Sequence, residues 1–293
     1  MQKSKVYFTK NITSESLLKI YDALGIKLQG KTAVKISTGE PGGHNFLNPH
    51  LIKPLVDKLN GTIIECNTAY PGRRNTSQAH WQTIKDHGFY DIAPCDIMDE
   101  NADMPIKVQH PFQIKENYIG EHFKNYNSML VLSHFKGHMM GGFGGALKNI
   151  AIGIASSRGK IHIHTAGKST NFDDAFTCVQ DDFLESMADA VSSVLNYMGS
   201  KNIAYINIAN NLSIDCDCDS NPAAPEMADI GIFASLDPVS ADKACVDAVY
   251  NSPDKGKASL IKRIEDKHGI HTAEAAAQHG LGSLEYELIN IDE

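Results

Sequence analysis

The segment from Ser133 to Asn149 concentrates reactive side chains and glycines. It contains two histidines, two lysines and five glycines within 17 residues. Imidazole groups bind metal ions or transfer protons near neutral pH, and glycine lets the backbone come close to a ligand. We therefore take His134, Lys136 and His138 as candidate catalytic residues, because together they offer an acid, a base and a cation.

The glycines of this segment lie between an apolar, strand-like run at 129–132 and a helix expected at 145–155. The free N–H groups at a helix start attract anions. We therefore predict that a small anionic molecule binds here, although the same glycines would also allow tight packing of the helix on a sheet. The predicted anion-binding residues are Arg73, Gly142, Gly144, Gly145 and Lys148.

A second reactive segment alternates three aspartates with two cysteines over residues 215–219. Thiolates bind soft metal ions, and nearby carboxylates add negative charge that favours a cation. A structural zinc site needs four ligands, so two more must come from elsewhere in the chain. The predicted ligands of a divalent metal ion are Cys216, Cys218, His134 and His138.

The same pattern has a simpler interpretation as a turn whose aspartates accept local backbone N–H groups. Without a metal ion, the acids are expected to raise the pKa of Cys216 and Cys218 and make both thiols poor nucleophiles. The other four cysteines are scattered singly along the chain. We expect these four to be reduced thiols that pack as small apolar side chains.

Polar loops follow three predicted strands, at 38–45, 67–75 and 134–148. The carboxyl ends of parallel strands share one edge of a sheet, where ligands bind in open α/β folds. We therefore expect the three loops to line one cleft. The cleft residues expected on this basis are Glu40, His44, Arg73, Arg74, His134, Lys136, His138 and Lys148.

Strand-like and helix-like runs alternate along most of the chain, which predicts an α/β fold with a mostly parallel sheet flanked by helices. The alternation at Lys160–His164 predicts a half-buried strand with both histidines on one face, where two hydrogen-bonded structural histidines are the simpler interpretation. We treat residues 1–293 as one unit. Polar and small residues cluster over 165–180, so this stretch is the candidate boundary between two lobes.

Composition limits the class of protein. Of 293 residues, 42% are hydrophobic, which is enough for a sizeable core, and the net charge is −8. That charge argues against binding to nucleic acid or to an anionic membrane surface. The sequence contains no apolar run of about 20 residues and begins with a polar segment, so we expect a cytoplasmic protein without a membrane span. A homodimer is the default oligomer.

Several motifs occur in one order between about residues 4 and 250, and together they resemble a known family. The motifs are Gly39-Glu40, Asn67–Tyr70 with Arg73 and Asn75, His80, Ser133–His138, Gly142–Asn149, Cys216-Asp217-Cys218, Asp229–Gly231 and Ser235–Val239. The chain resembles the uncharacterised iron–sulphur centre proteins, also called the domain of unknown function 362 family. The resemblance implies no settled reaction.

The chain departs from that family in one respect. Many members carry a ferredoxin-like insert with repeated cysteine motifs after the segment that corresponds to Lys160–His164. Here only Cys178 follows that segment before the next predicted helix, and one thiol cannot hold two four-iron clusters. We therefore expect no iron–sulphur clusters in this protein.

Two functions fit these observations. The first is a metal-assisted enzyme that acts on a small anionic substrate in a cleft at the strand ends, with His134 or His138 as acid and base. The alternative is a non-catalytic protein that binds a metal ion or a partner and has lost the clusters of its relatives.

Overall fold

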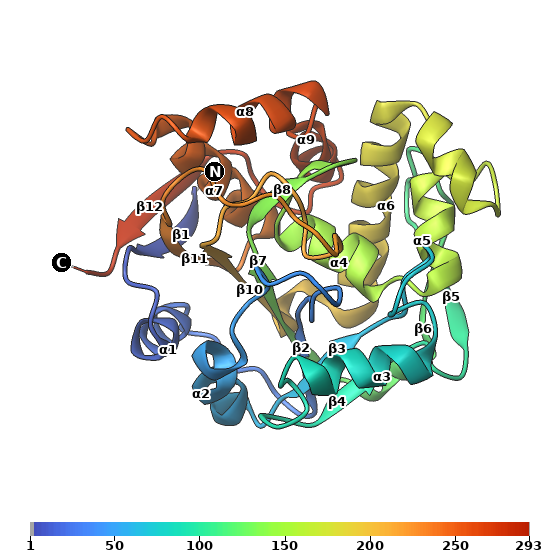
Figure 1. Cartoon of the computed structure of the whole chain (residues 1–293), viewed down its shortest axis with the longest axis horizontal. Coiled ribbons are helices and arrows are strands. Elements are labelled where there is room, and N and C mark those ends of the chain that lie inside the picture. The colour runs from blue at the N-terminus through green and yellow to red at the C-terminus, as the bar shows by residue number, and fades with distance from the viewer. Residues whose placement is uncertain (1–2, 293) are drawn as a thin grey trace.

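The computed structural model describes residues 3–292, in which one large sheet is covered by helices on both faces (Figure 1). All neighbouring strands are parallel except β11, which runs opposite to β1 and β10. The predicted α/β fold with a mostly parallel sheet is confirmed. In order across the sheet, the strands are β12 (Tyr286–Asn290), β1 (Ser4–Thr9), β11 (Gly231–Ser235), β10 (Ile203–Ala209), β7 (Ser128–His134), β2 (Thr32–Lys35), β3 (Thr62–Glu65) and β4 (Cys95–Ile97).

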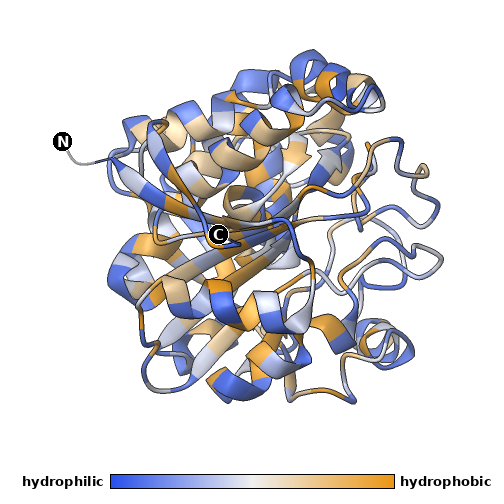
Figure 2. Cartoon of the chain, turned by 90° about the vertical axis from the view of Figure 1, so that its left-hand side faces the viewer, coloured by the Kyte–Doolittle hydropathy of each residue, from blue (hydrophilic) through white to orange (hydrophobic). Residues whose placement is uncertain are grey.

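The helices form two layers because successive side chains of each strand point to opposite faces of the sheet. Met129 and Val131 belong to a first apolar cluster on one face, whereas Leu130 and Leu132 belong to a second cluster on the opposite face. Figure 2 shows the hydrophobic residues on the central strands and on the helix surfaces that face them. The helices packed in the second cluster are α1 (Ser14–Ala23), α2 (Pro49–Leu59) and α3 (Ser77–Asp86). The helices around the first cluster and its neighbour are α4 (Ala146–Ile154), α5 (Ser157–His164), α6 (Gln180–Met198), α7 (Pro238–Asn251), α8 (Lys257–Asp266) and α9 (His271–Gln278).

Smaller elements complete the chain between the layers. Two short antiparallel pairs lie outside the large sheet. They are β5 (Asp103–Lys107) with β6 (Glu116–Gly120), and β8 (Lys136–His138) with β9 (Gly142–Gly144). The short 3-10 helices are η1 (Glu121–Asn125), η2 (Phe172–Thr177) and η3 (Ser200–Asn202). Within residues 3–292, every helix is too short or too polar to cross a lipid bilayer.

The predicted strand at Lys160–His164 is wrong, because these residues form the second half of α5. The Ser156 side chain caps this helix by accepting a hydrogen bond from the Gly159 N–H at 3.0 Å. Five alternating residues are too few to distinguish a strand from one side of a helix. As a helix, the segment places Lys160 and His164 on one buried side, while His162 is half-buried. The candidate lobe boundary at 165–180 contains η2, and a division into lobes stays a prediction.

The start of α4 is fixed by a residue from a distant part of the chain. The Asp242 carboxylate on α7 accepts hydrogen bonds from the Ala146 N–H at 2.6 Å and the Leu147 N–H at 3.0 Å. It also accepts one from the Asn207 amide on β10 at 2.7 Å. A Cβ atom on Gly145 would lie 2.3 Å from Asp242 Oδ1, so glycine is required for this approach. Asp242 thereby ties α4 to α7 and to the sheet.

We predict that Gly145→Ala lowers the free energy of unfolding by about 1–3 kcal/mol, because the added methyl group displaces the Asp242 carboxylate. Gly144→Ala is the matched control, since its Cβ would meet nothing closer than Lys148 Cδ at 3.4 Å. Urea unfolding of both variants measures the difference. Equal losses in the two variants would contradict the role given to Asp242.

Candidate metal centre

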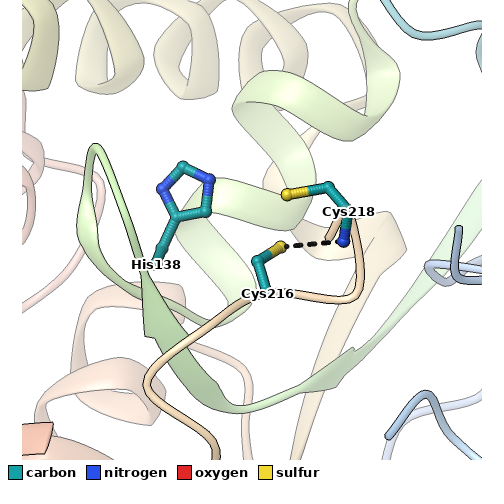
Figure 3. Close-up of side chains that lie close together, drawn as sticks. All are labelled: His138, Cys216 and Cys218. Atoms are coloured by element: carbon teal, nitrogen blue, oxygen red, sulfur yellow. Dashed lines mark hydrogen bonds between the residues drawn. The ribbon is translucent and has the colours of Figure 1, made fainter. Parts of the chain in front are cut away.

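Three predicted metal ligands converge at the carboxyl edge of the sheet. His138 ends β8, and Cys216 and Cys218 lie in the loop that follows β10. One ligand atom from each residue lies within 4.8 Å of the other two. Figure 3 shows the imidazole ring and the two sulfur atoms turned toward one another. His138 and Cys216 are buried and Cys218 is half-buried, so the site is shielded yet reachable.

The convergence of these three residues depends on Gly137 in the hairpin formed by β8 and β9. The Gly137 N–H donates a hydrogen bond to the Ser213 carbonyl at 2.8 Å. A Cβ atom on Gly137 would lie 2.3 Å from the Ile214 carbonyl oxygen. Any other residue would therefore push the cysteine loop away from β8. Because β7 and β10 are parallel neighbours, the segments that follow them begin at the same edge of the sheet.

A buried ion-pair network lies beside the three ligands and holds the cysteine loop. Asp217 accepts hydrogen bonds from His134 Nδ1 at 2.8 Å and from Lys136 Nζ at 2.9 Å. His134 Nε2 is 2.6 Å from the Asn210 carbonyl oxygen. Burial alone would raise the pKa of Asp217, but His134 and Lys136 hold it well below its usual range. Asp217 therefore carries a buried negative charge with two partners.

His134 lies beside the three grouped residues, and its role as a metal ligand stays a prediction. Both of its ring nitrogens lie within hydrogen-bond distance of protein oxygens. His138 differs because only one of its ring nitrogens has a partner in the described part of the chain. Its Nδ1 accepts hydrogen bonds from the backbone N–H groups of Gly141 and Met140 at 2.9 and 3.3 Å. Its Nε2 carries the proton of the neutral ring while Nδ1 accepts, and it has no hydrogen-bond partner among residues 3–292. It can bind a metal ion once that proton moves to Nδ1.

Burial, reinforced by the positive charge of Lys148, holds the pKa of His138 well below its usual range. The ring is therefore neutral near pH 7, which is the form that binds metal ions. A hydrogen bond from the Cys218 thiol lowers the pKa of Cys216, and burial opposes this effect. Lys148 Nζ, 3.6 Å from Cys216 Sγ, lowers that pKa further, and the resulting pKa is well below the usual range.

The expectation that nearby acids raise the pKa of both thiols is wrong for Cys216. The Lys136 ammonium balances the charge of Asp217, which also accepts a hydrogen bond from His134. Asp215 pairs with Arg263 at 3.3 Å and accepts the Ala223 N–H at 3.0 Å. The pKa of Cys218 is raised, because its thiol proton is shared with Cys216 and because it is buried.

A pocket of about 590 Å³ adjoins the three ligands and brings together most of the expected cleft residues. Lys136 and Lys148 line it next to the cysteines, and Glu40 and Arg74 line it from the loops after β2 and β3. His44 lies elsewhere, at a separate surface depression. Residues of the pocket wall that the sequence analysis did not place in the cleft include Met139, Lys160, His164, Phe172 and Phe176.

The two neighbouring arginines have different roles. The Arg73 side chain is 57% exposed and lies 3.4 Å from Asp86, although the residue lines the pocket. Arg74 is buried, and its Nε donates to Glu40 Oε2 at 2.8 Å. Its charge is thus largely balanced by the protein. Anion binding by Arg73 stays a prediction. Arg74, and not Arg73, is the arginine whose head group is buried.

Only some of the predicted anion-binding glycines line the pocket. Gly144 and Gly145 line the pocket with Lys148, whereas Gly142 packs against Gly269. The first amides of α4 donate to Asp242, so the protein itself supplies the negative charge at this helix start. Lys148 faces the pocket next to Cys216 and has no carboxylate partner among the described residues. Anion binding by these residues stays a prediction.

We predict that Asp217→Ala lowers the free energy of unfolding by about 3–5 kcal/mol, because it leaves Lys136 buried without its counter-ion. Because the pKa of Asp217 is lowered by folding, its contribution is present above about pH 4 and is lost as the pH falls further. The variant should therefore lose less stability on acidification. Asp57→Ala, which removes an exposed pair with Lys53, should cost less than about 1 kcal/mol. Equal costs in urea unfolding would show that the buried network is not stabilising.

Comparisons with known proteins identify a family but no reaction. No sequence among the curated proteins matches this chain. Eight solved chains match in structure. The lactate racemase apoprotein from Thermoanaerobacterium thermosaccharolyticum is 13% identical with a TM-score of 0.48, and the match covers 84% of this chain and 57% of that one. A Thermotoga maritima protein is 11% identical with a TM-score of 0.45, and the match covers 90% of this chain and 58% of that one.

This chain therefore spans less than two thirds of either solved relative. Residues 32–247 match the model of a domain of unknown function, DUF362. The matched residues include the hairpin, the start of α4 and the cysteine loop. The iron–sulphur part of the resemblance stays unconfirmed, and the six cysteines are free thiols. The match covers most of the chain, which belongs to the DUF362 family.

Proposed function

We propose that this protein is a metal-assisted enzyme that holds one divalent metal ion on His138, Cys216 and Cys218 and acts on a small anionic molecule in the adjoining pocket. The observation that carries the proposal is the convergence of these three ligand atoms within 4.8 Å beside the pocket. Two sulfur ligands and one imidazole suit zinc, which is bound by cysteine at about 2.3 Å and by histidine at about 2.0–2.1 Å.

The number of ligands supports a catalytic rather than a structural site. Structural zinc sites have four protein ligands, whereas catalytic sites have three and leave one position for water or substrate. The protein groups described next to the thiols are His138 and Lys148, and a lysine is not a fourth ligand while it is charged. A bound metal ion would supply a polarised oxygen or a water with a pKa of about 7.

The pocket supports a small anionic ligand with an apolar part. Lys148 faces the pocket, and its hydrogen-bond partner among the described residues is the Cys216 sulfur. Once that sulfur binds a cation, Lys148 can pair with an anion of the substrate. The exposed side chains of Met139 and Phe176 and the neighbouring Phe172 supply apolar surface. About 300–1,000 Å³ is the usual size of a small-molecule site, which includes this pocket.

The alternative, a non-catalytic metal-binding protein, would use the same three ligands but would not need the pocket. Mutation of a pocket residue outside the metal ligands distinguishes the two. Lys148→Met should leave the amount of bound metal unchanged in the proposed enzyme and weaken binding of small anions.

We predict about one zinc ion per chain in protein purified without a chelator. Cys216→Ser and Cys218→Ser should each reduce the zinc affinity by at least about 100-fold, because a metal–thiolate bond is lost. Cys178→Ser is the matched control, since this thiol lies outside the pocket lining. Elemental analysis and competition with a coloured chelator measure both quantities. Equal zinc content in the cysteine variants and the parent protein would rule out this site.

We also predict that zinc binding moves the backbone amides of Met140 and Gly141. Figure 3 shows one ring nitrogen of His138 turned toward the sulfurs and the other turned away. Zinc bound at Nε2 leaves the ring proton on Nδ1, where the two amides now donate. The amide signals of these two residues in a ¹⁵N–¹H spectrum should shift on zinc addition, and the Gly25 signal should not. Unchanged signals at full zinc occupancy would mean that His138 does not bind through Nε2.

A further inference from the structure

Helix α5 brings two titratable side chains to the pocket wall that the proposed metal site does not use. Lys160 and His164 are one helical turn apart, both are 7% exposed, and both line the pocket. His162, which lies between them in sequence, faces a different depression. The pair comes from the segment whose alternation predicts a strand. A strand would place His162 on the same face as the pair, whereas the helix separates His162 from it.

Lys160 differs from the other buried lysines because it has no counter-ion. Lys35 lies 2.8 Å from Glu65, and Lys136 lies 2.9 Å from Asp217. Lys160 Nζ instead donates to the Ala155 carbonyl oxygen at 2.6 Å, and it forms no ion pair within residues 3–292. A buried ammonium without a paired anion is unfavourable. Its amine is therefore predisposed to lose its proton and keep a reactive lone pair.

The charges around Lys160 agree with this geometry. Burial is the largest influence and lowers the pKa of Lys160, and Lys35 adds to the effect. Cys66, Asp99 and Glu65 oppose it, but the pKa remains below its usual value. Glu65 already pairs with Lys35, so it is not a dedicated counter-ion for Lys160.

His164, one helical turn after Lys160, is held as a neutral base in the same pocket wall. Its Nδ1 donates to the Lys160 carbonyl oxygen at 2.7 Å, which leaves the lone pair on Nε2. The ring stacks on Phe183 with a centroid distance of 4.8 Å. Burial lowers the pKa of His164 to about 4. Nε2 has no partner among the described residues, and the residue lines the pocket, so Nε2 is available to a ligand.

We propose that Lys160 forms an imine with the carbonyl carbon of a small keto acid or aldehyde acid bound in this pocket, with His164 moving the protons. The proposal rests on the proposed function only in that the pocket holds the anionic substrate. The metal ligands take no part in the step.

The step balances without an oxidant or a reductant. The lone pair of Lys160 Nζ forms a bond to the carbonyl carbon, and the electron pair of the carbonyl bond moves to oxygen. His164 Nε2 takes each of the two amine protons in turn and passes it to that oxygen. The oxygen leaves as water while the nitrogen completes the double bond to carbon. Hydrolysis by the reverse route releases the amine.

The test uses pyruvate as the probe and sodium borohydride to reduce any imine to a stable amine. At pH 7, where exposed lysines with a pKa of about 10.4 are protonated, we expect one reduced pyruvate per chain, located at Lys160 by peptide mass mapping. Lys160→Met should abolish this adduct, and the exposed Lys53→Arg should not. His164→Ala should slow its formation by about 100-fold without changing its position.

The outcomes separate this proposal from the metal site. The double variant Cys216→Ser, Cys218→Ser should lose zinc and still form the adduct at Lys160. Loss of zinc with an unchanged adduct would therefore support the imine at Lys160 independently of the zinc site. An adduct at Lys148 or Lys136, labelling spread over exposed lysines, or no adduct in the parent protein would overturn the proposal. The map of the parent protein decides the matter even if Lys160→Met does not fold.

Discussion

The buried carboxylate of Asp217 is the constraint on which the candidate site depends. It lies between the two cysteines in sequence and pairs with His134 at the end of β7 and with Lys136 at the start of β8. Its own backbone carbonyl accepts the Glu40 N–H at 2.7 Å, from the loop after β2. One residue therefore joins three segments that are distant in sequence. Because a buried charge without partners is unfavourable, this arrangement has few alternatives.

The ion-pair network around Asp217 also explains how two thiols and an imidazole can form a buried site that accepts a metal cation. Asp217 pairs with the Lys136 ammonium and accepts a hydrogen bond from His134, so Lys148 is the cation next to the sulfurs that has no carboxylate partner in the described part of the chain. A thiolate at Cys216 and a neutral His138 are the protonation states that a metal ion needs. The wall formed by α5 adds the buried Lys160 amine, whose pKa is lowered by burial, to the same pocket. The proposed metal ligands and the proposed nucleophile thus lie in one pocket and use different residues.

Much of this arrangement could be predicted from the sequence, because parallel strands bring the segments that follow them to one edge. The apolar runs predicted β7 and β10, and the reactive residues came directly after them. The convergence of His138 with Cys216 and Cys218 followed from that topology. The prediction could not distinguish Arg73 from Arg74, since the direction of each side chain depends on Glu40, more than thirty positions away. Asp242 was equally hidden, because it caps a helix that begins 96 residues earlier. The helix α5 was missed because its short alternation fits both periods.

The number of sulfur atoms bound to the metal tests the account most directly. X-ray absorption at the zinc edge of protein loaded with one equivalent of zinc counts them. We expect two sulfur ligands at about 2.3 Å and two lighter ligands at about 2.0–2.1 Å, one of them the imidazole of His138. A spectrum with four sulfur ligands would mean that two chains share the ion. A spectrum with no sulfur ligands would contradict the central claim that the cysteine loop and the hairpin form a metal site.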